Sequence, residues 1–207
     1  MINFFDLFQL SALAFFLVIF LGRTLLLWLK QGINPFALGA GKKGLHRFFE
    51  LALFPWLVLW LLAIIVSALH SPRWLISAIG TPFLLNSLPF QIAGCLVIGF
   101  GNFLFVWALI SFGNSWRVGI DERKAGALVT GGAFAFSRNP IFVFLDLYFI
   151  GTFLINGTLA FLIFAGVTIL GIHYQILQEE RFLFSKYGQA YREYCSRTGR
   201  YVSLIPK

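Results

Sequence analysis

Five long apolar stretches constrain this chain more than any other feature. They cover residues 4–29, 51–69, 88–112, 139–155 and 158–177; Arg23 interrupts the first, and Asp146 lies inside the fourth. An apolar run of about 18 residues or more is typical of a membrane-spanning helix. Only 12% of the residues are charged, against about 25% in an ordinary soluble domain. The sequence therefore predicts an all-α, polytopic membrane protein of about five transmembrane helices, with residues 1–207 as a single integral membrane domain.

The positions of the basic residues predict the orientation in the membrane. Nearly all Lys and Arg residues lie in the segments 30–47, 117–138 and 181–207. Loops rich in Lys and Arg stay in the cytoplasm, so we expect an extracytoplasmic N-terminus and a cytoplasmic site, in a cell inner membrane or an endomembrane. A net charge of +8 is also compatible with nucleic-acid binding. The charges follow the loops and form no dense basic run, so membrane lipids are the expected partner and nucleic acid is not.

Two polar tetrapeptides lie at the cytoplasmic edges of the last two apolar stretches. Residues 137–140 read SRNP and open the fourth stretch, while residues 178–181 read QEER and close the fifth. Asn156-Gly157 joins the two stretches, and this pair readily forms a tight turn. The stretches should therefore form a C-terminal helical hairpin that brings both tetrapeptides to one membrane face. Aromatic and charged residues alternate after Glu180, which predicts an interfacial cytoplasmic helix above this site.

The residue types at this face suit a small zwitterionic ligand. Ser137 or Asn139 could cap the fourth helix, whose N-terminus favours a carboxylate or phosphate, and Arg138 could add a bidentate clamp. Glu179 and Glu180 offer acceptors for an ammonium group or ribose hydroxyls. Nearby aromatic side chains could stack on a purine or contact a cation. S-adenosylmethionine carries all of these groups. The alternative is that Arg138 and the glutamates only pair across the hairpin.

The motifs in this region resemble those of the isoprenylcysteine carboxyl methyltransferase and phospholipid methyltransferase superfamily. Residues 128–134 (LVTGGAF), 138–142 (RNPIF), 179–180 (EE) and 187–191 (YGQAY) follow the family order L-V-x-x-G-x-Y, R-H-P-x-Y, E-E and F-G-x-x-Y. The resemblance covers about residues 113–202 and implies a cofactor-binding C-terminal half, S-adenosylmethionine as the cofactor, and a lipophilic or lipid-like methyl acceptor. It implies Glu180 beside a cofactor pocket lined by Leu128, Val129, Phe134, Asn139, Pro140, Phe142 and Glu179.

The chain departs from the family pattern at several positions. Asn139 stands for the usual histidine, so it cannot act as a proton switch. Phe134 and Phe142 replace tyrosines, which keeps aromatic stacking and loses the hydroxyl bonds. Gln175 occupies the place of an arginine that faces the substrate carboxylate in the isoprenylcysteine enzymes. A neutral side chain there makes a prenylcysteine carboxylate doubtful, and suits an amine, thiol or hydroxyl acceptor as well.

Roles follow from these positions. We expect Arg138 and Glu179 to anchor the cofactor, with Arg138 and Glu180 as the catalytic residues and Glu180 as the general base. His173 is a weaker candidate base, with helix packing as its alternative. Gln175 and Asp146 are the expected substrate-binding residues. A carboxylate inside a span is costly unless it is functional or paired, so the alternative for Asp146 is a structural partner, either Arg23 or His173.

Two other functions fit the sequence less well. A membrane sterol or enone reductase using NADPH would have a similar C-terminal half with an R-H-P-N-Y motif. Phe142 lacks the phenol that such an enzyme would use as a proton donor, and Ile141 replaces its polar Asn. A transporter or an assembly subunit of a membrane complex would carry charges along several helices, whereas only Arg23 and Asp146 qualify here. We expect no metal site.

Overall fold

The fold is known from a computed structural model, which describes residues 2–31, 45–70, 80, 85, 87–113 and 128–203, with the backbone alone for residues 30, 31 and 45–51. The described chain is helical. Its helices are α1 (Phe4–Gln31), α2 (Leu45–Leu69), α4 (Leu88–Phe112), α5 (Ala133–Phe136), α6 (Pro140–Asn156), α7 (Leu159–Tyr187) and α8 (Gln189–Arg197). The expectations for the segments 32–44, 114–127 and 204–207 lie outside the described residues.

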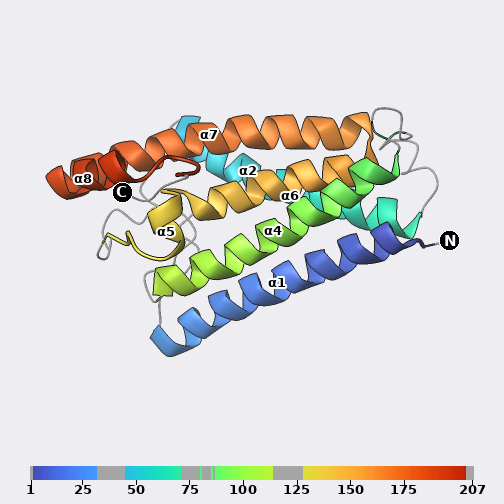
Figure 1. The fold of residues 1–207 in the computed structure, drawn as a ribbon, viewed down its shortest axis with the longest axis horizontal. Helices are drawn as coiled ribbons and strands as arrows, with labels where there is room; N and C mark the ends of the chain where they lie inside the picture. The colour runs from blue at the N-terminus through green and yellow to red at the C-terminus, as the bar shows by residue number, and fades with distance from the viewer. Residues whose placement is uncertain are drawn as a thin grey trace.

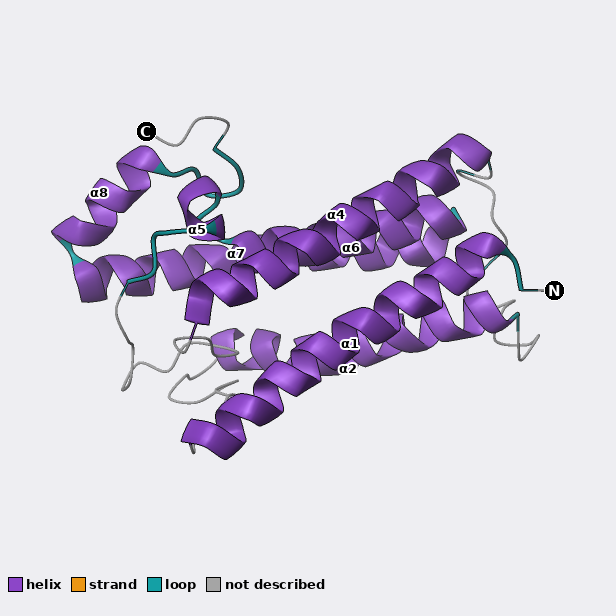
Figure 2. Cartoon of the chain, turned by 60° about the horizontal axis from the view of Figure 1, so that its bottom comes forward, coloured by secondary structure: helices purple, strands orange, loops and turns teal. Residues whose placement is uncertain are grey.

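The predicted membrane fold is confirmed. Helices α1, α2, α4 and α7 are each long and apolar enough to cross a membrane, and α6 is a shorter apolar helix. The long helices run roughly side by side, with the N-terminus at one end of the bundle and α5, α8 and the C-terminus at the other (Figure 1). Figure 2 shows α4, α6 and α7 together, with the α1–α2 pair on one side of them. The polar elements are thus gathered at one end of an apolar bundle.

Helices α4 and α6 form the closest helix pair, because glycines lie at their contact. A Cβ atom on Gly94 would lie 2.6 Å from Ile155 Cγ1 and 2.7 Å from the backbone oxygen of Gly151. A Cβ atom on Gly151 would in turn lie 2.4 Å from Ile98 Cγ1. Small residues let membrane helices approach closely. This contact fixes the axis of α6, and with it the position of the residues at the start of α6.

The hairpin of α6 and α7 has the predicted turn. Gly157 ends α6 in the left-handed conformation, with φ of +62°, and its N–H donates to the carbonyl of Phe153 at 2.7 Å. Thr158 then caps α7 by accepting from the N–H of Phe161 at 3.4 Å. Helix α6 runs away from the end of the bundle that holds α5 and α8, and α7 returns to that end (Figure 1). The hairpin therefore brings residues near 138 and 180 together, as the sequence predicts.

The predicted start of the amphipathic helix is wrong. We expected a new helix directly after Glu180, but α7 continues without a break to Tyr187. Residues 178–187 contain neither Gly nor Pro, so no residue there interrupts the backbone hydrogen bonds. The break comes at Gly188, with φ of +52°, and the short helix α8 follows. Helix α8 buries Tyr191 and Tyr194 on one face.

Candidate functional site

The short helix α5 is anchored on the end of α4. The N–H of Ala133 donates to Ser111 Oγ at 3.0 Å. The ring of Phe134 packs edge-on against Phe112, with centroids 5.0 Å apart. From the other side, the hydroxyl of Tyr194 on α8 donates to the carbonyl of Phe134 at 2.6 Å. Helix α5 is thus held between α4 and α8, and it delivers the chain to the start of α6.

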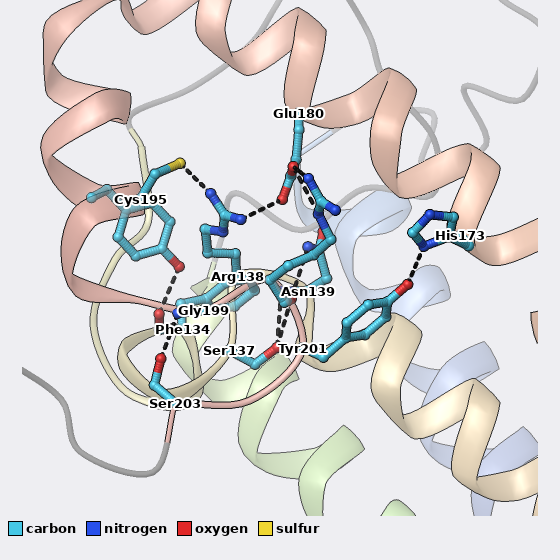
Figure 3. Close-up of polar contacts among 12 residues, drawn as sticks. Phe134, Ser137, Arg138, Asn139, His173, Glu180, Cys195, Gly199, Tyr201 and Ser203 are labelled. Carbon is cyan, nitrogen blue, oxygen red and sulfur yellow. Dashed lines mark hydrogen bonds and ion pairs between the residues drawn. The ribbon is translucent and has the colours of Figure 1, made fainter.

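The residues after α8 fold back onto the start of α6. We call residues 198–203 the return segment. The N–H of Arg138 donates to the carbonyl of Gly199 at 3.0 Å, and the N–H of Ser203 donates to the carbonyl of Phe136 at 2.6 Å. Asn139 Nδ2 donates to the carbonyl of Arg200 at 3.1 Å. The approach to α6 and the return segment therefore form one hydrogen-bonded unit, which Figure 3 shows below Glu180.

Two arginines flank one buried glutamate in this unit. Glu180, on α7, is 4% exposed. Its Oε2 accepts from Nε and Nη2 of Arg200 at 3.0 and 2.8 Å. Its Oε1 lies 3.1 Å from Nη2 of Arg138 (Figure 3). This hydrogen bonding to Glu180 is the first cause that raises the pKa of the Arg200 guanidinium. The three side chains carry a net charge of about +1, given the usual ionisation of Arg and Glu.

The two arginines bind Glu180 differently. Arg200 makes two hydrogen bonds to one oxygen. Arg138 makes an ion pair without hydrogen-bond geometry, and Oε1 accepts no hydrogen bond from the part of the chain that the structure describes. Nε of Arg138 is also buried with no hydrogen-bond partner among the described residues. Buried polar atoms in proteins nearly always have a partner. Arg138 therefore has donor capacity left over, and Glu180 has an acceptor left over, at the same place.

The sulfur of Cys195 lies on the other side of the Arg138 guanidinium, and Nη1 of Arg138 donates to it (Figure 3). Burial is the first cause that raises the pKa of the neighbouring Tyr191 phenol, and its interactions with Glu180 and Cys195 add to it. Burial also raises the pKa of Tyr194, while the charge of Arg138 lowers it. These phenols are therefore neutral donors at physiological pH, around a charged centre.

Helix capping at the start of α6 differs from the prediction. Asn139 occupies the cap position, but its side chain accepts no capping hydrogen bond within the described residues. Its amide donates to the return segment instead, and its own N–H donates to Ser137 Oγ at 3.0 Å. The reason is that the carbonyl of Arg200 lies within reach and competes for the side chain. Asn139 therefore holds the return segment.

The expected structural partners of Asp146 are also wrong. Arg23 donates to the carbonyl of Gly113. His173 Nδ1 contacts the hydroxyl of Tyr201 at 2.5 Å. Oδ1 of Asp146 is buried without a hydrogen-bond partner in the described chain. Both expected partners are thus engaged by other segments, which the order of residues along the chain could not indicate.

The remaining predicted site residues are distributed around this centre. Leu128 and Val129 are half-buried just before α5, Pro140 is buried as the first residue of α6, and Phe142 is half-buried in the first turn of α6. Glu179 accepts from Gln175 Nε2 at 3.4 Å, within α7. The structure brings Arg138, Asn139 and Glu180 together. It places Glu179 beside Gln175, one turn earlier on α7.

Sequence reasoning missed the contribution of the return segment and of α8. Arg200 looks like one more cytoplasmic charge, and no spacing rule relates it to a glutamate 20 positions earlier. Tyr191 and Tyr194 carried a usable signal, because residues three apart share a face of a helix. Within the described residues, no group of three or more His, Cys, Asp or Glu side chains is arranged to hold a metal ion.

Comparisons with known proteins agree with the resemblance in the motifs. A family model for phospholipid methyltransferase matches residues 90–190, which include most of α4 and all of α5, α6 and α7. The chain is also 28% identical over 145 residues to the protein-S-isoprenylcysteine O-methyltransferase of Schizosaccharomyces pombe. That alignment covers 69% of this chain and 58% of the relative. Both matches support the integral membrane methyltransferase family that the sequence predicts.

Proposed function

We propose, because both matches support membership of the integral membrane methyltransferase family, that this protein uses S-adenosylmethionine to methylate a lipophilic small molecule or lipid-like acceptor. The cofactor would supply a methyl group on its sulfonium: the acceptor atom would bond to the methyl carbon in line with the breaking carbon–sulfur bond, and the neutral thioether would leave. Such a reaction depends mainly on positioning and on exclusion of water. The chain would therefore need to orient the cofactor at the polar end of the bundle and admit an acceptor from the membrane.

One observation carries the cofactor assignment. Arg138 has a buried Nε without a partner among the described residues, and it makes only an ion pair to Glu180. Glu180 Oε1 accepts no hydrogen bond from the described chain. A ligand with one carboxylate and one donor group would satisfy both side chains at once. The amino-acid part of S-adenosylmethionine has this pair of groups, so the residues present fit the cofactor.

The nucleoside would lie over the neighbouring residues. We assign Leu128, Val129, Phe134, Asn139, Pro140 and Phe142 to the lining of this part of the pocket, with Glu179 as a further anchor. Phe134 and Phe142 would offer apolar surface to the purine. The role of general base suits Glu180 less well than the sequence indicates, because Arg200 donates two hydrogen bonds to its Oε2 and Arg138 faces its Oε1, so both carboxylate oxygens already lie against guanidinium groups. Glu180 therefore serves the cofactor in this proposal.

The acceptor would enter between helices, beneath the cofactor. Gln175 and Asp146 are its proposed contacts, on α7 and α6. Asp146 supports this, because an unpartnered carboxylate oxygen in a membrane span favours a functional role. A carboxyl group at this place would disfavour a carboxylate acceptor and suit one that carries a proton, such as an amine. The site would face the cytoplasm, where the basic segments place it.

Calorimetric titration of the purified protein in detergent tests the cofactor. We expect saturable binding of S-adenosylhomocysteine and none of NADPH. Arg138→Gln should lower the affinity for S-adenosylhomocysteine by about 10- to 100-fold, because the variant loses hydrogen bonds to a charged group. Arg192→Gln, on the exposed side of α8, is the control and should bind normally. Binding of NADPH instead would favour a reductase, and binding of neither ligand to folded protein would refute the proposal.

A further inference from the structure

We propose that Arg200 is a positioning residue of the cofactor site: by holding Glu180, it frees Arg138 to bind the carboxylate of the cofactor. This inference rests on the proposed function. It adds a residue of the return segment, outside the matched residues 90–190, to a site otherwise built from α5, α6 and α7.

The division of the Glu180 carboxylate between the two arginines is the first support. Both hydrogen bonds to Glu180 Oε2 come from Arg200, at 2.8 and 3.0 Å. The contact of Arg138 with Oε1 is an ion pair at 3.1 Å without a hydrogen bond. Arg138 can therefore turn away from Glu180 and leave that carboxylate with its hydrogen bonds intact. If Arg200 were absent, the same movement would leave a buried carboxylate with no cation, which is strongly unfavourable.

The charge of the cluster gives the second support. Two arginines and one glutamate sum to about +1 at neutral pH, so one bound carboxylate would bring the cluster to neutrality. Without Arg200, one guanidinium would face two carboxylates in a buried site. Burying an uncompensated charge is costly. Arg200 therefore supplies the cation that allows a second carboxylate to bind.

The backbone of Arg200 is held in place for this role. Its carbonyl accepts from Asn139 Nδ2 at 3.1 Å, next to the N–H of Arg138, which donates to Gly199. Gly199 begins a tight turn: a Cβ atom there would lie 2.7 Å from the carbonyl oxygen of Val202. Its N–H donates to Ser203 Oγ at 2.5 Å. The two arginines are therefore attached to one hydrogen-bonded unit and approach Glu180 from fixed positions.

Two ligands that differ in the amino-acid part test the inference. S-adenosylhomocysteine carries the carboxylate, and 5′-methylthioadenosine has the same nucleoside and thioether without it. Calorimetry on the full chain in detergent should show that Arg200→Gln lowers the affinity for S-adenosylhomocysteine by about 10- to 100-fold. The same variant should bind 5′-methylthioadenosine within about threefold of wild type. The affinity of Arg200→Lys for S-adenosylhomocysteine should lie between those of wild type and Arg200→Gln, because lysine keeps the charge but lacks the planar guanidinium.

The outcomes separate this inference from the proposed function. Equal weakening of both ligands in Arg200→Gln would show a general structural role and overturn the inference, as would unchanged binding of S-adenosylhomocysteine. Arg192→Gln, which removes the same charge from an exposed position, should bind both ligands normally. If Arg200→Gln does not fold, Arg200→Lys decides between the same results. Wild-type protein that binds neither ligand would instead refute the proposed function itself.

Discussion

Glu180 on α7 accepts two hydrogen bonds from Arg200, a residue of the segment that follows α8, at 2.8 and 3.0 Å. This contact closes the polar end of the bundle, because it ties the last described residues of the chain to the longest membrane helix. Arg138 approaches the same carboxylate from the start of α6. The candidate site is therefore built by three segments that meet only after the whole C-terminal half has folded.

Neutralising Glu180 should destabilise the protein and reveal its coupling to Arg200. Glu180→Gln leaves two guanidinium groups facing each other without a buried anion, so we expect a loss of about 1–3 kcal/mol in the free energy of unfolding. Arg200→Gln should then cost less in the Glu180→Gln background than in wild type, since residues in one network are not additive. Thermal unfolding in detergent, followed by tryptophan fluorescence, measures both effects. Glu193→Gln, an exposed carboxylate on α8, should be neutral, and an unchanged melting temperature for Glu180→Gln would contradict the buried cluster.

The crossing of α4 and α6 should tolerate no added methyl group at Gly94. Its Cβ would lie 2.7 Å from the backbone oxygen of Gly151, and backbone cannot move aside cheaply. We expect Gly94→Ala to lower the free energy of unfolding by about 1–3 kcal/mol, as for overpacked cores. Gly99→Ala is the matched control on the same helix, because a Cβ there meets no described atom within 4 Å. Gly99→Ala should be neutral or stabilise by about 0.5–1 kcal/mol. Equal melting temperatures for the two variants would argue against this helix crossing.

Asp6 of α1 and Asp146 of α6 should respond oppositely to removal. Asp6 accepts from the N–H of Asn3 at 2.8 Å and pairs with His70 Nε2 at 3.0 Å, so Asp6→Ala should cost about 1 kcal/mol. Asp146 has an oxygen without a partner in the described chain, so Asp146→Ala should preserve or raise the melting temperature. The same Asp146 variant should bind S-adenosylhomocysteine normally, because Asp146 is assigned to the acceptor. A large loss of stability in Asp146→Ala would show that this carboxylate has a structural partner.

Stability should fall at high pH because of the buried tyrosines. Burial is the first cause that raises the pKa values of Tyr191, Tyr194 and Tyr201 in the folded protein. In the unfolded chain these phenols ionise near about pH 10. Above that pH the unfolded state loses protons that the folded state keeps, so stability decreases as pH rises. Melting temperatures between pH 8 and 11 should therefore be flat first and then fall. Tyr194→Phe should make the fall shallower; a steeper fall in that variant would contradict the raised pKa.

The membrane fold could be predicted because it depends on local properties of the sequence. Apolar stretches long enough to span a bilayer give the helices, and the Asn156-Gly157 turn gives the α6–α7 hairpin that brings residues 138 and 180 together. Even the motifs of the site are contiguous in sequence, so their resemblance to a family could be recognised, and both comparisons support it. The prediction of a new helix after Glu180 was wrong for a local reason. Residues 178–187 contain no helix-breaking residue, so α7 continues until Gly188.

The pairing of charges was decided by the tertiary structure alone. The sequence suggested Arg23 or His173 as the partner of Asp146, yet Arg23 contacts Gly113 and His173 contacts Tyr201. The sequence also predicted that Asn139 could cap α6, whereas its side chain donates to the carbonyl of Arg200. These choices depend on where the chain returns after α8, and a helix period or a motif spacing holds no information about contacts across 20 to 90 residues. Hydropathy determined which segments enter the membrane, while the geometry of the return segment determined which charged groups meet.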